Sequence, residues 1–113
     1  DPKTFREDLR FVLQTLREDV SRNTMIGNLP NLTRLPRFQR APDPRVTLAK
    51  VNAYNEAIAQ EARDVSASVV DLFAQPVRGE LIFDVDGFHP NDAGHREIAR
   101  LFVQAILAKL SVK

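Results

Sequence analysis

The sequence predicts an α/β fold built around a parallel sheet. Three long stretches, residues 2–20, 44–63 and 92–110, repeat apolar residues at intervals of three and four, as amphipathic helices do. Between them, residues 24–27 and 65–73 contain short apolar runs of the kind that form buried parallel strands. Regular alternation of helices and strands is typical of α/β folds with a parallel sheet.

The first helix is predicted over residues 2–20. Asp1 is a favoured N-cap residue, and Pro2 suits the first helical position because its missing N–H has no helical partner there. The predicted buried face of this helix consists of Phe5, Leu9, Val12, Leu13, Leu16 and Val20.

The first strand, residues 24–27, leads into a predicted loop over residues 28–43 that contains Pro30, Pro36 and Pro42. A loop of this length in a compact domain is usually either functional or disordered. Its apolar side chains need cover from water, which argues against disorder. These side chains are Leu29, Leu32, Leu35 and Phe38.

The second helix is predicted over residues 44–63, starting at Pro44, and its buried face is Val46, Val51, Tyr54, Ile58 and Ala62. The following strand, residues 65–73, has Val69, Val70 and Leu72 as its core, and a turn is predicted at 75–80. Asn91 is predicted to cap the last helix, residues 92–110. The apolar face of that helix is Ile98, Leu101, Phe102, Ala105, Ile106 and Leu110.

Composition excludes several classes of protein. The chain has 113 residues, of which 43% are hydrophobic, enough for the core of one domain. Its 16 Lys and Arg residues are interleaved with 15 Asp and Glu residues, so we expect no nucleic-acid partner. A group of arginines in one loop is interpreted as solvated: Arg34, Arg37, Arg40 and Arg45.

The chain contains no cysteine, which excludes a disulfide framework and a thiolate metal site. No apolar run approaches the roughly 20 residues that a membrane-spanning helix needs. Lack of cysteine does not decide the compartment, and we favour a bacterial secreted or cell-envelope location over the cytoplasm.

The segment with the clearest chemical pattern is Asp86-Gly87-Phe88-His89-Pro90-Asn91. A carboxylate three residues before a histidine can bind one imidazole nitrogen while the other faces outward as a proton acceptor. Pro90 restricts the backbone of His89 to extended conformations, which helps to orient the ring. We therefore predict His89 as a general base and Asp86 as the group that orients it.

Two neighbouring residues offer alternatives. Asp84 lies on the same side of the chain as Asp86 if the segment is extended, and is interpreted as a supporting carboxylate or an exposed residue. His95 has no spacing typical of a metal site, so no metal is expected.

A nucleophile is missing from the pattern. The four serines, Ser21, Ser66, Ser68 and Ser111, have no glycine-rich turn around them. The sequence therefore contains the base and its orienting carboxylate but not the group that they would activate.

Asp86-x-x-His89-Pro90-Asn91, followed by Ala93-Gly94-His95, resembles the last conserved block of the SGNH (GDSL-type) hydrolases. Met25 to Pro36 is similar to the strand and loop that precede this block in one branch of the family. The resemblance implies a flavodoxin-like α/β/α sandwich and hydrolysis of carboxylic esters by a Ser-His-Asp triad. It implies a packing role for His95 and none in the chemistry. It covers essentially all 113 residues as the C-terminal part of a single domain.

The resemblance also defines what this chain lacks. The family's nucleophilic serine and the Gly and Asn of its oxyanion hole have no counterpart here and are expected in an N-terminal part before Asp1, in the same gene or a second chain. Two predicted strands are also too few to cover three helices. The alternative is a non-catalytic fragment that associates with a partner through its exposed sheet edge.

The resemblance implies that no cofactor is required and that the substrate is a short-chain ester, a lipid or an acetylated sugar; the sequence does not choose among them. In open α/β sheets the ligand crevice lies at the carboxyl ends of the strands. Asn28, Leu29, Leu32 and Phe38 follow such an end and are therefore predicted to bind substrate. The alternative interpretation of Asn28 to Asn31 is a simple turn.

Overall fold

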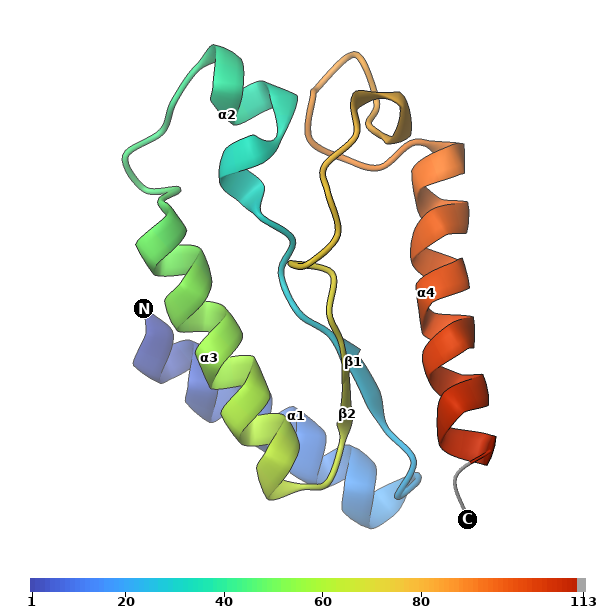
Figure 1. Ribbon diagram of the computed structural model, residues 1–113. Coiled ribbons are helices and arrows are strands. Elements are labelled where there is room, and N and C mark those ends of the chain that lie inside the picture. Colours follow the sequence, from blue (N-terminus) through green and yellow to red (C-terminus); the bar gives the residue numbers. More distant parts are fainter. Residues whose placement is uncertain (112–113) are drawn as a thin grey trace.

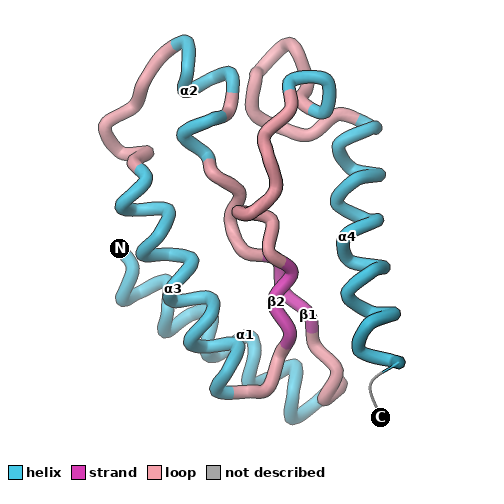
Figure 2. The backbone as a smooth tube through the Cα atoms, viewed as in Figure 1, coloured by secondary structure: helices cyan, strands magenta, loops and turns pink. Residues whose placement is uncertain are grey.

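The computed structural model describes residues 1–111 and has helices on both sides of a short parallel sheet (Figures 1 and 2). In chain order the three long helices and the two strands are α1 (Pro2–Asp19), β1 (Met25–Gly27), α3 (Leu48–Asp64), β2 (Ser68–Val70) and α4 (Asp92–Ser111). Helices α1 and α3 lie together on one side of the strands, and α4 lies on the other (Figure 1). The predicted α/β fold with a parallel sheet is confirmed and is compatible with a flavodoxin-like α/β/α sandwich.

The sheet of the described residues consists of β1 and β2, with Met25 opposite Ser68 and Gly27 opposite Val70. Beyond the strands, the Asn28 N–H donates to the Val70 carbonyl over 3.1 Å. Strand β2 is much shorter than the predicted 65–73, because Val65 still belongs to the end of α3 and the chain turns away from β1 after Val70. Each strand has one edge without a partner strand within residues 1–111.

Helix starts follow local capping, with one correction. The Asp1 carboxylate accepts a hydrogen bond from the Lys3 N–H over 2.8 Å, as predicted for the start of α1. Helix α3 does not begin at Pro44: Thr47 is its N-cap and accepts from the Lys50 N–H over 3.2 Å. Pro44 belongs instead to a turn, closed by the Asp43 carboxylate and the Arg45 N–H.

The predicted loop over residues 28–43 is partly helical, which corrects that expectation. It contains the single 3-10 turn η1 (Leu32–Arg34) and the short helix α2 (Pro36–Arg40). A second 3-10 turn, η2 (Gly79–Leu81), replaces the end of the predicted turn at 75–80. Both α2 and η2 lie near the carboxyl ends of the strands, where the candidate site is found (Figure 1).

The core lies between α1, α3 and the sheet. Its most buried apolar side chains are Leu13, Leu35, Val51, Ala57, Ile58, Ala62, Val65 and Val70. Several residues of the predicted apolar faces are instead exposed, namely Val12 on α1, Val20 at the C-cap of α1, and Ile106 and Leu110 on α4. The apolar face of α4 is therefore covered in its first half and open in its second.

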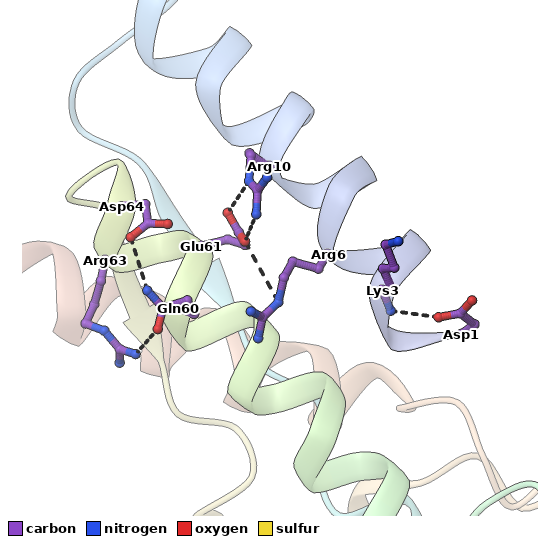
Figure 3. Close-up of polar contacts among 8 residues, drawn as sticks. All are labelled: Asp1, Lys3, Arg6, Arg10, Gln60, Glu61, Arg63 and Asp64. Carbon is purple, nitrogen blue, oxygen red and sulfur yellow. Dashed lines mark hydrogen bonds and ion pairs between the residues drawn. The ribbon is translucent and has the colours of Figure 1, made fainter.

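A buried carboxylate joins α1 to α3 (Figure 3). Glu61 is 1% exposed, and its two oxygens accept hydrogen bonds from the Arg10 guanidinium over 2.8 and 3.0 Å. The hydrogen bonds from Arg10 lower the pKa of Glu61, and the charges of Arg10 and of Arg6, 3.9 Å away, act in the same direction against the effect of burial. Bidentate geometry of this kind compensates the cost of burying the charge and fixes the two helices relative to each other.

Candidate active site

The loop from Ile82 to Asn91 enters the start of α4 and closes on itself. Ile82 and Pro90 form an antiparallel bridge, and the Phe83 N–H donates to the His89 carbonyl over 2.8 Å. Within this closed loop the Gly87 N–H donates to the Phe83 carbonyl over 2.9 Å. We call residues 83–89 the histidine loop. Its backbone is set by its own hydrogen bonds, at the carboxyl end of the sheet.

Asp86 binds both the backbone and the side chain of this loop. One carboxylate oxygen accepts from the N–H groups of Phe88 and His89 over 2.8 and 3.1 Å. The other oxygen lies 2.6 Å from Nδ1 of His89. The hydrogen bond with the His89 side chain, together with the two backbone N–H groups, lowers the pKa of Asp86 to about 2. Asp86 is therefore ionised at neutral pH and holds the turn and the imidazole at the same time.

This contact assigns the two nitrogens of His89. An ionised carboxylate can only accept, so Nδ1 carries the proton that it donates to Asp86. Neutral imidazole then has its lone pair on Nε2, which makes no hydrogen bond within residues 1–111. The side chain of His89 is 72% exposed, so that nitrogen is accessible. The arrangement is able to take a proton from a group placed next to Nε2.

Asn91 and Gly94 join the histidine loop to α4. The Asn91 side chain caps the helix by accepting from the Gly94 N–H over 2.9 Å, and it donates to the Glu80 carbonyl over 2.8 Å. The backbone of Leu81 lies against Gly94 so closely that a methyl group there would collide with the Leu81 carbonyl oxygen. Glycine at this position lets η2 and the first turn of α4 approach each other.

Asn28, one of the predicted substrate-binding residues, connects the carboxyl ends of the two strands. Its side chain donates to the Asp71 carboxylate over 2.9 Å and accepts from the Phe73 N–H over 2.9 Å. Both ends of the amide are therefore engaged in the protein. Substrate binding by Asn28 stays a prediction.

Leu29 and Leu32 face an apolar cavity of about 450 Å³ between the loop after β1, the η2 turn and the first half of α4. Leu81, Ile98 and Leu101 form much of the opposite wall. Phe88 and Pro90, the two neighbours of His89, also line it. The cavity thus extends to the base of the histidine loop.

Asn55 on α3, which positions this wall, was not predicted from the sequence. Its amide donates to the Leu29 carbonyl over 2.9 Å and accepts from the Leu29 N–H over 2.7 Å. Phe38, the fourth predicted substrate-binding residue, is not part of the cavity wall. Its ring packs edge-on against Phe88, with 6.0 Å between the ring centroids.

Asp84 and His95, the other two residues considered near the histidine loop, lie at the surface. Asp84 is exposed and makes no hydrogen bond or ion pair within residues 1–111. His95 is exposed on the first turn of α4, so the expected packing role is wrong. No group of three or more potential ligands in residues 1–111 is arranged to hold a metal ion, and no helix there is long and apolar enough to cross a membrane.

Comparison with known proteins gives one result. Searches of the curated proteins and of the solved structures found no match. The model of the GDSL-like Lipase/Acylhydrolase family matches residues 1–97, which include both strands, the histidine loop and the start of α4. On this match over most of its length, the chain belongs to the GDSL-like lipase/acylhydrolase family of hydrolases.

Proposed function

We propose that this chain contributes the general base and its orienting carboxylate to a serine esterase that hydrolyses carboxylic esters. The observation that carries the proposal is the 2.6 Å contact between Asp86 and Nδ1 of His89, with Nε2 accessible. In the proposed reaction His89 takes the proton of a serine as its hydroxyl attacks the ester carbonyl, and then gives this proton to the leaving alcohol. In the second step His89 takes a proton from the water molecule that attacks the acyl-enzyme, and returns it to the serine as the acid leaves.

The serine is proposed to come from a segment outside residues 1–113. Ser21 precedes β1, Ser66 precedes β2, and Ser68 is the first residue of β2, so all three lie at the amino ends of the strands. The histidine loop lies on the carboxyl side of the sheet. Ser111 ends α4, a 20-residue helix of roughly 30 Å, whereas His89 precedes its start. A serine nucleophile must lie within hydrogen-bond reach of its base. The placement of these four serines therefore supports a nucleophile supplied from elsewhere, along with the oxyanion hole.

An N-terminal segment of the same enzyme is the proposed source. The free edge of β1 offers unpaired backbone groups to a further parallel strand. The second half of α4 adds exposed apolar side chains, namely Val103, Ile106, Leu107 and Leu110. No other long helix of residues 1–111 lies on the α4 side of the strands (Figure 1). We use "assembled enzyme" for residues 1–113 together with this serine-bearing segment.

The experiment that tests the proposal is labelling of the native protein, with its co-purifying chains, by a fluorophosphonate. This reagent phosphonylates a serine whose hydroxyl is activated by a base. We expect a single labelled serine outside residues 1–113, found by mass spectrometry of the digested protein. Labelling of Ser21, Ser66, Ser68 or Ser111, or no labelling in a protein that hydrolyses p-nitrophenyl acetate, would contradict the proposal.

The apolar cavity is proposed to receive the acyl chain of the substrate, which fits a lipid or other ester with a hydrocarbon part better than an acetylated sugar. Its wall is formed mainly by apolar side chains, and Phe88 and Pro90 connect it to the histidine loop. Of the residues predicted to bind substrate, Leu29 and Leu32 are the two that line it.

Leu32→Ala should enlarge this cavity and favour longer acyl chains. We expect kcat/KM for p-nitrophenyl octanoate relative to p-nitrophenyl acetate to rise about tenfold in the assembled enzyme, since a small change in an apolar pocket discriminates by about this factor. Leu48→Ala, a half-exposed leucine at the start of α3, is the matched control and should leave the ratio unchanged. An unchanged ratio for Leu32→Ala with a large loss of melting temperature would mean that Leu32 is only part of the core.

A further inference from the structure

Helix α2 contacts the histidine loop through its backbone. The Arg37 N–H, in the first turn of α2, donates to the Gly87 carbonyl over 2.9 Å. Gly87 is buried against this helix, and a methyl group on it would lie 2.9 Å from the Arg37 nitrogen and 3.3 Å from Cβ of Pro36. It would also collide with the Arg40 guanidinium, although that flexible group has room to move. The backbone nitrogen has no such freedom, so Gly87 permits the close approach.

A second contact runs from α2 to the imidazole through aromatic rings. Phe38 packs edge-on against Phe88, and Phe88 packs edge-on against His89 with 4.9 Å between ring centroids. Edge-to-face pairs of this geometry are favourable beyond the area that they bury. The ring of His89 is therefore held on one side by Asp86 and on another by Phe88, whose own position depends on Phe38.

These contacts matter because His89 has few others. Its side chain is 72% exposed, so beyond Asp86 and Phe88 little of residues 1–111 packs against the ring. A displacement of about 1 Å in a catalytic group costs on the order of 100-fold in rate. The position of the loop, set from α2, then determines whether Nε2 meets the serine.

We propose that α2 positions the general base by holding the histidine loop, and that Gly87 and Phe38 are positioning residues for His89. Gly87 lets the loop dock on the backbone of α2, and Phe38 holds Phe88 against the imidazole. This inference rests on the proposed function of His89. It assigns Phe38 a role different from direct contact with substrate, in agreement with its absence from the cavity wall.

Gly87 also has a positive φ of +62°, which favours glycine independently of α2. Asparagine separates the requirement for a positive φ from the requirement for close approach to α2. It tolerates this backbone conformation but still carries a Cβ that meets the Arg37 nitrogen. If docking on α2 is what matters, Gly87→Asn should fail almost as badly as Gly87→Ala. If only the backbone conformation matters, Gly87→Asn should be nearly normal.

The test compares variants of the assembled enzyme on p-nitrophenyl butyrate, with kcat, KM and melting temperature measured for each. We expect Gly87→Ala and Gly87→Asn to lower kcat about 100-fold while KM changes less than about threefold. Phe38→Ala should lower kcat about tenfold, and Phe38→Leu should recover most of that loss because it refills the space beside Phe88. Gly79→Ala is the matched glycine control, because a methyl group there meets nothing within 4 Å.

Several results would overturn the inference. These are a kcat within twofold of the parent for Gly87→Ala, a normal kcat for Gly87→Asn, and equal losses for Phe38→Leu and Phe38→Ala. If Gly87 variants do not fold, the Phe38 pair decides alone. His89→Ala in the same assay separates failure of the proposed function from failure of this inference. An active His89→Ala enzyme would exclude the proposed function itself. An inactive His89→Ala enzyme together with normal Gly87 and Phe38 variants would exclude only the proposed role of α2.

Discussion

His89→Ala is expected to lower kcat for ester hydrolysis by at least about 1,000-fold in the assembled enzyme. Without the imidazole nothing at this site takes the proton from the serine, and Asp86 has nothing left to orient. The loss should appear in kcat, with KM within a few-fold of the parent, because the exposed ring is not part of the apolar cavity wall. Initial rates on p-nitrophenyl butyrate, corrected for spontaneous hydrolysis, measure it.

The matched control for this prediction is His95→Ala. His95 is the second histidine of the chain, six residues further on and exposed on α4, and its removal should change kcat less than twofold. Melting temperatures of both variants should stay within a few degrees of the parent. A His89→Ala enzyme that retains a tenth of the parent rate would exclude His89 as the general base.

The features that the sequence predicted best are those fixed over a few residues. Asp86 and His89 are three apart in one turn, so their spacing already implies the contact that the structure shows. The caps at Asp1 and Asn91 are local in the same way. Pro44 shows the limit of such signals, because proline suits the first position of a helix and a turn equally well. There the Asp43 carboxylate closes a turn, and Thr47 starts the helix.

Contacts between distant segments left no local signal. Asn55 binds the backbone of Leu29 across 26 positions, and nothing near either residue marks the pair. Helix α2 has only five residues, too few for an apolar period to emerge, so its contact with Gly87 was also missed. These are the contacts that shape the cavity and hold the histidine loop.

The α4 face shows a different reason for failure. Its apolar period is correct for a buried face, yet Leu110 is 66% exposed. The strands do lie beside the second half of α4, where Lys109 Nζ is 3.3 Å from Ser68 Oγ and Phe102 lies next to Gly27. Two strands of three residues each are, however, too narrow a sheet to cover the whole apolar face there. The sequence pattern is that of a larger sheet than residues 1–111 contain, as the proposed N-terminal segment requires.

Asp86→Asn is expected to lower kcat by about 1,000- to 10,000-fold at neutral pH. Asparagine has nearly the same shape, and its carbonyl oxygen is able to accept from the N–H groups of Phe88 and His89 as Asp86 does. Its NH₂ group would then face Nδ1 of His89 and donate to it. That contact places the imidazole proton on Nε2, the nitrogen that has to accept the serine proton, and it removes the negative charge that stabilises the imidazolium.

The same substitution should change how stability depends on pH. The folded-state pKa of Asp86, about 2, lies below the value of about 3.9 for an unfolded aspartate. A lowered pKa contributes stability above the unfolded value and loses this contribution as the pH falls from about 4 toward 2. The parent should therefore melt at a higher temperature than Asp86→Asn at pH 7, and the difference should shrink between pH 4 and pH 2.

Asp84→Asn is the control for both measurements, because Asp84 is a carboxylate of the same loop, exposed and without a polar partner in residues 1–111. It should leave kcat and the pH dependence of melting unchanged. Asp86→Ala adds a second comparison, since it removes the acceptor for the turn as well and should melt below Asp86→Asn. If Asp86→Asn keeps kcat within tenfold while Asp86→Ala loses both activity and stability, Asp86 maintains the turn and another group orients His89. A large loss of kcat in Asp86→Asn with the turn intact is the result that the 2.6 Å contact predicts.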